Sequence, residues 1–139
     1  MGKRILIVDD EVELADIIAI YFQRQGWQTS HAAHGKQALS QLDSFQPDVI
    51  LSDIIMPEMD GMELLIELDR RQIEIPLIFI TGFRDIDKMR KAWGLCAFDF
   101  LDKPFNEKTM IAVAENAYEH GRHYVRSARK RYKALKKAA

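Results

Sequence analysis

The 139-residue sequence contains a single cysteine, Cys96. One cysteine excludes a disulfide within the chain and is typical of proteins in a reducing cytoplasm. No apolar stretch approaches the roughly 20 residues that a membrane-spanning helix needs. The first residues lack the long apolar segment of a secretion signal, and glycine-rich nucleotide fingerprints and Walker-type loops are missing. We therefore expect a cytoplasmic protein without a membrane contact or a nucleotide-binding loop.

The net charge is small, but the charged residues are unevenly distributed along the chain. The net charge is −1, yet residues 119–139 hold eight Lys or Arg against one acidic residue, a net charge of +7. The preceding 118 residues hold 12 basic and 20 acidic residues, a net charge of −8. An acidic body with a basic tail predicts two parts with different roles. We place one compact domain at residues 1–120 and a basic helical extension or linker at 121–139.

Short apolar runs alternate with segments of helical spacing along the body. Strands are expected at residues 4–8, 27–32, 48–52, 77–80 and 97–101. Helices are expected at residues 11–24 and 35–44, after Asp60-Gly61, at 84–93, and from about Asn106. The strand at 48–52 is nearly all apolar, as expected of a strand buried on both faces. The alternation predicts an α/β fold with three layers, a doubly wound parallel sheet of five strands between helices.

A polar residue follows most of these strands at its carboxyl end. Asp9 and Asp10 follow the first, Asp53 the third, Thr81 the fourth, and Lys103 comes shortly after the fifth. These ends share one edge of a parallel sheet, where open α/β folds bind their ligands. Two adjacent carboxylates repel each other, and a hard cation such as Mg2+ removes that cost. The pattern predicts a site that holds a divalent metal and handles a phosphoryl group.

Each of these residues also has a simpler explanation. Asp9 could begin a helix as its N-cap, and Asp53 could start a turn that includes Pro57. Lys103 could be a solvated loop lysine, and Thr81 could belong to a turn with the glycine that follows it. Because all of them fall at one sheet edge, we favour the functional interpretation.

The order Asp-Asp, Asp, Thr, Lys-Pro at successive strand ends resembles the receiver domain of two-component response regulators, with its chemotaxis-type fold. The resemblance runs from about Lys3 to about Tyr118, and residues 53–61 look like the family's signature around its phospho-accepting aspartate. It implies the strand order 2-1-3-4-5 and a role for Asp53 as phosphoacceptor. The phosphoryl group would come from a histidine kinase or a histidine phosphotransfer protein, and the receiver would be part of a larger regulator. The chain would be a signalling phosphoacceptor that assists its own transfer and slow dephosphorylation, not an enzyme.

The resemblance also assigns the metal ligands. Asp10 and Asp53 would bind Mg2+ directly, the backbone carbonyl of Ile55 would add a ligand, and Asp9 would act mainly through a bound water. Lys103 would contribute a positive charge to the phosphoryl oxygens and be joined to Pro104 by a cis bond.

A second group of residues would control the signal and its lifetime. Thr81 would donate its hydroxyl to a phosphoryl oxygen, and Phe100 is the expected switch aromatic that turns inward in response. The surface of the fourth helix, fifth strand and fifth helix would then change. Ile55 and Phe83 stand two residues after the phosphoacceptor and two after the threonine, where the family tunes hydrolysis. Both are apolar, which predicts that water is excluded and the phosphorylated state is long-lived.

The C-terminal part of the sequence shows a heptad pattern. Its members alternate in spacings of three and four residues: Ile111, Ala114, Tyr118, Gly121, Val125, Ala128, Tyr132 and Leu135. The pattern predicts one long helix that continues past the domain. It could form a homodimer, relay a signal to an output domain, or contact an acidic partner; a solvated basic linker helix is the alternative. The surface of the fourth helix, fifth strand and fifth helix is the other candidate dimer contact.

Two other function classes share some features of this sequence. A hydrolase of the dehalogenase type also uses an aspartate nucleophile, but it expects a second acid two residues later, where Ile55 stands. A DNA-binding regulator is suggested only by the basic tail, and no helix-turn-helix follows, so no direct nucleic-acid contact is expected. The four histidines show no ligand pattern and are predicted to be surface residues: His31, His34, His120 and His123.

Overall fold

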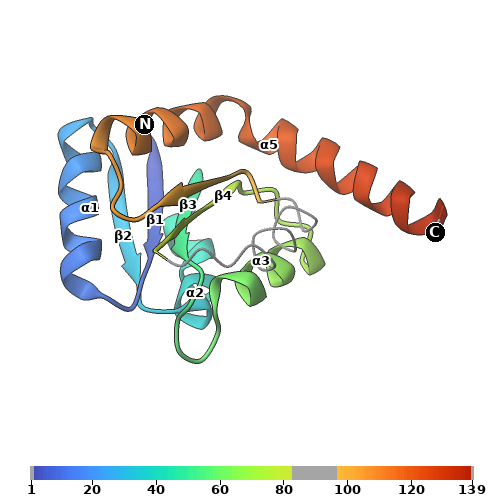
Figure 1. Cartoon of the computed structure of the whole chain (residues 1–139), viewed down its shortest axis with the longest axis horizontal. Helices are drawn as coiled ribbons and strands as arrows, with labels where there is room; N and C mark the ends of the chain where they lie inside the picture. The colour runs from blue at the N-terminus through green and yellow to red at the C-terminus, as the bar shows by residue number, and fades with distance from the viewer. Residues whose placement is uncertain (1, 83–96, 139) are drawn as a thin grey trace.

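A computed structural model describes residues 2–82 and 97–138. Within them, five parallel strands form one sheet in the order β2-β1-β3-β4-β5 (Figure 1). The strands are β1 (Arg4–Val8), β2 (Gln28–Ala32), β3 (Val49–Asp53), β4 (Leu77–Thr81) and β5 (Asp99–Asp102). The helices in the same ranges are α1 (Val12–Arg24), α2 (Gly35–Phe45), α3 (Gly61–Arg70) and α5 (Glu107–Ala138). The predicted fold class and strand order are confirmed.

Some of the predictions differ from the structure or fall outside it. The fifth strand was predicted from residue 97 but begins at Asp99. Phe98 already donates its backbone N–H to the carbonyl of Leu77 at 2.8 Å, so the chain joins the sheet before the regular ladder starts. The expected helix at 84–93, together with Phe83 and Cys96, lies outside the described residues.

Apolar side chains of the strands point alternately to the two faces of the sheet. In β1, Leu6 and Val8 belong to one core cluster, and Ile5 and Ile7 belong to the other. Helices α2 and α3 complete the first cluster, and α1 and α5 complete the second. The central strand β3 is buried on both faces, which explains its nearly continuous apolar run. The sheet therefore has a helix layer on each side, visible in Figure 1.

The C-terminal helix α5 is one continuous helix of 32 residues. Its buried positions are Met110, Ala114, Ala117, Gly121 and Val125. Gly121 lies directly against the proline that precedes β4: a Cβ atom at Gly121 would be 2.4 Å from Cγ of Pro76. Beyond the sheet, Tyr124 packs edge-on against Phe98, with 5.2 Å between the ring centroids. The helix is thus docked on its own domain well past residue 120.

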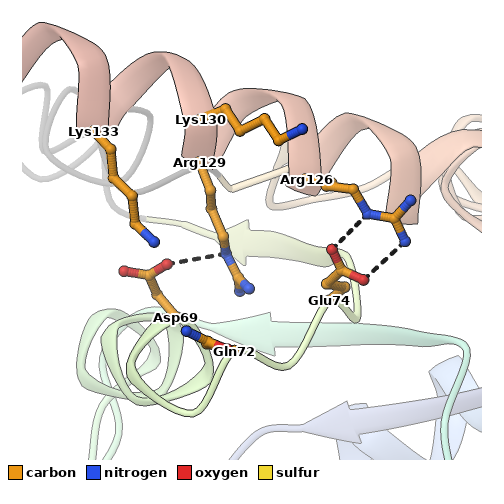
Figure 2. Close-up of a pocket in the computed structure, with 7 residues that line it drawn as sticks. All are labelled: Asp69, Gln72, Glu74, Arg126, Arg129, Lys130 and Lys133. Carbon is orange, nitrogen blue, oxygen red and sulfur yellow. Dashed lines mark hydrogen bonds and ion pairs between the residues drawn. The ribbon is translucent and has the colours of Figure 1, made fainter.

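Two arginines of α5 extend this docking to the connection between α3 and β4 (Figure 2). Arg126 forms two hydrogen bonds to the carboxylate of Glu74, at 2.8 and 3.0 Å. Arg129 donates to the backbone carbonyl of Ile73 at 2.6 Å, and its Nε lies 3.1 Å from Oδ1 of Asp69. The Arg126 guanidinium holds the pKa of Glu74 below its usual range. Part of the basic tail is therefore neutralised by acidic residues of the body.

These contacts explain part of the heptad pattern by packing within the chain. Three members of the pattern, Ala114, Gly121 and Val125, are buried against the chain's own domain, whereas Leu135 is 70% exposed. The predicted long helix is confirmed, and it passes residue 120 without interruption. The division into residues 1–120 and 121–139 stays a prediction. No helix in residues 2–82 and 97–138 has both the length and the apolar character to cross a membrane.

Replacing Gly121 by Ala tests the docking. In an exposed helix, Gly→Ala stabilises by about 1 kcal/mol. Here the added methyl group would meet Pro76 at 2.4 Å, and overpacking costs about 1–3 kcal/mol. We expect Gly121→Ala to lower the free energy of unfolding by about 1 kcal/mol in urea denaturation. As a control, Ala112→Gly at an exposed position of the same helix measures the effect of helix propensity without any change in packing. If Gly121→Ala is instead more stable than wild type, the helix is not docked in solution.

Candidate functional site

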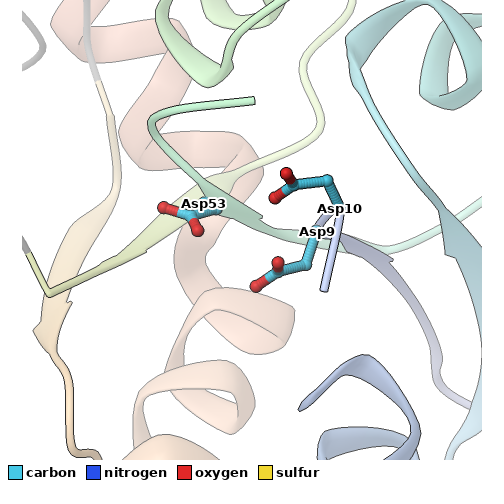
Figure 3. A group of neighbouring side chains, drawn as sticks. All are labelled: Asp9, Asp10 and Asp53. Atoms are coloured by element: carbon cyan, nitrogen blue, oxygen red, sulfur yellow. The ribbon is translucent and has the colours of Figure 1, made fainter. Parts of the chain in front are cut away.

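The carboxyl edge of the sheet collects the polar residues that follow the strands. Register pairs Val8 with Ser52, the residues just before Asp9 and Asp53. The same edge receives Thr81, the last residue of β4. The side chains of Asp9, Asp10 and Asp53 gather there (Figure 3), each offering a carboxylate oxygen within 4.8 Å of the others. The predicted acidic cluster is therefore present in the folded chain.

Lys103 joins this cluster from the end of β5. Its Nζ donates to Oδ2 of Asp53 at 3.0 Å and lies 3.6 Å from Oδ2 of Asp9. Its backbone N–H donates to the carbonyl of Thr81 at 2.9 Å, and the bond to Pro104 is cis. Burial acts to lower the pKa of Lys103, but the hydrogen bond that Lys103 donates to Asp53 and the charges of the nearby carboxylates outweigh this effect, so the pKa is raised. The lysine is held charged against the acids.

Asp9 is the most buried acid of the cluster, with 2% of its surface exposed. Burial is the main cause that raises its pKa, and the charge of Asp53 adds to it. The backbone N–H of Glu11, 2.9 Å from Oδ1, and the charge of Lys103 act in the opposite direction without cancelling the rise. Ionised Asp9 is therefore a source of strain that a bound cation would relieve.

The donor set fits Mg2+. Magnesium prefers oxygen ligands, uses one or two carboxylates with several waters, and does not need a closed protein cage. The three acids offer carboxylate oxygens at graded exposure, from buried Asp9 to exposed Asp10. Among the residues that the structure describes, Lys103 sets one positive charge against the three carboxylates, so a divalent cation would balance the remaining negative charge. Asp9, Asp10 and Asp53 could hold the ion, and the Ile55 carbonyl is the ligand implied by the resemblance.

Asp53 is fixed in orientation by two hydrogen bonds. Its Oδ1 accepts the backbone N–H of Ile54 at 2.7 Å, and its Oδ2 accepts Nζ of Lys103. The connection that follows passes very close to this strand end, because a Cβ atom at Gly61 would be 2.2 Å from the Asp53 carbonyl oxygen. Helix α3 then begins with a capping box between Asp60 and Glu63. Only glycine at position 61 permits this close approach.

The predicted switch residues lie on neighbouring strands. Thr81 is buried at the end of β4, and Phe100 pairs with Phe79 in the register between β4 and β5. The rings of Phe79 and Phe100 pack with centroids 5.6 Å apart. Ile55, one of the two predicted hydrolysis-tuning residues, is 49% exposed beside the site; the other, Phe83, lies outside the described residues.

Two of the histidines predicted to be surface residues, His31 and His34, are partly buried and have structural partners. His31 is half-buried on β2, and its Nε2 is 2.8 Å from the backbone carbonyl of Asp9. His34 caps α2 by accepting the N–H of Gln37, and its Nε2 lies 3.5 Å from the carboxylate of Glu58. No local pattern marks His31, because only the pairing of β1 with β2 brings it beside Asp9.

The fold and the site define a class of protein. Residues 5–115 match the response regulator receiver domain family, so the chain belongs to that family. Phosphorylation and binding of Mg2+ are general features of that family.

Individual relatives agree with this assignment. The chain is 35% identical to the regulatory protein AtoC of Escherichia coli over 117 residues, 84% of this chain and 25% of AtoC. It is 33% identical to the response regulator SaeR of Staphylococcus aureus over 112 residues, 81% of this chain and 49% of SaeR. It therefore spans between a quarter and a half of these relatives.

Solved structures show the same fold. The receiver domain of NtrX from Brucella abortus has a TM-score of 0.77 and 34% identity, over 83% of this chain and 98% of that one. The receiver domain of the Francisella response regulator 1452 has a TM-score of 0.79 and 28% identity, over 86% and 98%.

Replacing Asp9 by Asn tests the electrostatic strain. Because the folded-state pKa of Asp9 is raised, its ionisation costs stability above that pKa and costs nothing below the unfolded value. Without Mg2+ we expect Asp9→Asn to be more stable than wild type at pH 7, with the difference shrinking toward pH 4. Urea denaturation at several pH values measures it. Added Mg2+ should raise the stability of the wild type more than that of the variant; a variant less stable than wild type at pH 7 without Mg2+ contradicts the prediction.

Proposed function

We propose that this chain is the phospho-accepting module of a two-component or phosphorelay system, in which Asp53 receives the phosphoryl group. The observation that supports this best is the position of Lys103, whose Nζ lies within 3.6 Å of both Asp53 and Asp9. At that place Lys103 puts a positive charge beside the nucleophile, and the cluster of three carboxylates keeps an excess of negative charge. We expect a histidine kinase or a histidine phosphotransfer protein as donor, acting in the cytoplasm.

The transfer follows from the residues present. An oxygen of the Asp53 carboxylate attacks phosphorus, the phosphorus–nitrogen bond of the donor phosphohistidine breaks, and the imidazole nitrogen keeps the electron pair. The Ile54 N–H, 2.7 Å from Oδ1, holds the carboxylate in one orientation. When bound by the acidic cluster, Mg2+ would supply positive charge to the phosphoryl oxygens.

The remaining polar groups stabilise the product. Lys103 would transfer its contact from the carboxylate to a phosphoryl oxygen, where negative charge has accumulated. Thr81 would donate its hydroxyl to another oxygen from the end of β4. Phe100 would then turn inward and change the surface that includes β5 and α5; the expected fourth helix, the third part of that surface, lies outside the described residues. In this role the chain assists its own phosphorylation and slow dephosphorylation, and it is a signalling module, not an enzyme.

The proposal extends to self-association. A homodimer through the C-terminal helix would use Ala128, Tyr132 and Leu135, because Ala114, Gly121 and Val125 are buried against the chain's own domain. Ile111 and Tyr118, the other earlier members of the heptad pattern, also contact that domain. The surface of β5 and α5 is the other candidate. Either contact belongs to the larger regulator of which the relatives' lengths suggest this chain is a part.

Phosphorylation at Asp53 can be measured directly. We expect wild type to gain one phosphoryl group from acetyl phosphate in the presence of Mg2+, and to gain none when Mg2+ is removed by EDTA. Intact-mass spectrometry measures the gain. Asp53→Asn should gain nothing, whereas the control Asp43→Asn, an exposed residue of α2, should behave as wild type. Equal labelling of wild type and Asp53→Asn would refute the assignment.

The lifetime of the phosphorylated state tests the hydrolysis-tuning pair. A hydrolytic water must stand in line with the bond between Asp53 and phosphorus, and apolar Ile55 and Phe83 offer no polar atom to orient it. We expect the double variant Ile55→Asn, Phe83→Glu to lose phosphate faster, on the order of tenfold. The protein is loaded, the donor is removed, and the label is followed over time. If both proteins lose label at the same rate, these side chains do not exclude water and only pack or contact partners.

A further inference from the structure

The connection from β3 to α3, residues 54–60, runs beside the acidic cluster and is called the arch below. It is held at its base and in its outer part. At its base, Gly61 donates its N–H to the carbonyl of Ile54 at 2.8 Å, which closes the two ends against each other. Ile54 and Met56 are buried in the core and anchor the first half. Ile55, between them, exposes its side chain. The base of the arch is therefore held by its own residues.

The outer part of the arch is held by a different element, the start of α2. The backbone N–H of Gly35 donates to the carbonyl of Met59 at 2.8 Å. The side chain of Met59 packs against the core cluster that also contains residues of α2 and α3. Next to it, the carboxylate of Glu58 approaches Nε2 of His34 at 3.5 Å. Two neighbouring residues of the arch, Glu58 and Met59, thus contact the N-cap residue and the first residue of α2, His34 and Gly35.

The contact at Gly35 leaves no room for a larger residue. A Cβ atom there would lie 2.5 Å from Cγ, 2.7 Å from Sδ and 3.0 Å from Cβ of Met59. Gly35 does not have a positive φ, since Gly26 is the only glycine with one in the described residues. The backbone conformation therefore does not require glycine at position 35. Glycine is required at position 35 because the side chain of Met59, a residue of the arch beside the site, occupies the space that a Cβ atom would need.

We propose that Gly35 and Met59 are positioning residues for the metal and phosphoryl site, because their close contact sets where the arch lies relative to the carboxylates of Asp9, Asp10 and Asp53. This inference rests on the proposed function and on the Ile55 carbonyl, the metal ligand of the arch that the resemblance to receiver domains implies. Neither residue touches the ion or the reacting atoms. Their effect is transmitted through the backbone of residues 55–59, as outer residues commonly do for a metal site.

The test is a double-mutant cycle that uses binding of Mg2+ alone as its readout. Gly35→Ala, Met59→Ala and the double variant are compared with wild type by isothermal titration calorimetry. Gly35→Ala should weaken Mg2+ binding by about tenfold, the lower end of what outer residues of metal sites contribute. In the Met59→Ala background, where the crowding Cγ and Sδ atoms are gone, Gly35→Ala should have little further effect. Such non-additivity is the mark of direct coupling between the two residues.

Controls separate positioning from folding and from the proposed function. Gly2→Ala makes the same chemical change where the nearest atom would be 3.6 Å away, and it should bind Mg2+ as wild type does. Urea denaturation without Mg2+ reports any loss of folding. If Gly35→Ala does not fold, Met59→Ala alone still tests the proposal, because it should bind Mg2+ more weakly.

The outcomes are distinct. If wild type binds no Mg2+, the proposed function fails. If wild type binds Mg2+ and the folded Gly35→Ala and Met59→Ala variants bind it equally well, the proposed function stands and the positioning role is wrong. The role is also wrong if the two substitutions weaken binding additively.

Discussion

The contact of Lys103 with Asp53 and Asp9 is the interaction on which the site depends. Three carboxylates within 4.8 Å of one another repel, and one of them, Asp9, is almost fully buried. The lysine offsets part of this repulsion, and the repulsion that remains favours the binding of a cation. A structure that had satisfied these charges completely would have no reason to bind either a metal ion or a phosphoryl group.

Two close backbone approaches shape the surroundings of this interaction. Gly61 lets the arch return to the end of β3, and Gly35 lets Met59 pack on α2. Both glycines are selected by a neighbouring atom and not by a left-handed conformation. The acids therefore lie at strand ends, while the arch that passes beside them is held by the first residues of α2 and α3. Rigid elements position each functional group, which is what an electrostatic site needs.

Helix α5 packs on one face of the sheet and reaches Pro76 at the amino-terminal end of β4. Small residues let the helix approach Pro76, and Arg126 and Arg129 bind the connection between α3 and β4. Pro76, just before β4, packs against Gly121 of the helix, and the end of β4 carries Thr81. Phe98, just before β5, packs on Tyr124, and the end of β5 leads to Lys103. The two strands thus connect the proposed switch to the helix that continues beyond the domain.

The sequence by itself determined the fold class, the approximate elements and the carboxyl-edge residues, because strand burial and strand ends depend on local apolar runs. It could not decide which charges meet: the partners of Lys103, the contact of His31 with the Asp9 carbonyl, and the ion pairs of Arg126 and Arg129 join residues far apart in the chain. The heptad pattern shows the same limit. A spacing of three and four residues indicates that one face of a helix is buried, but only the tertiary structure shows that Gly121 and Val125 are buried against their own domain, since periodicity records the presence of a contact and not its partner.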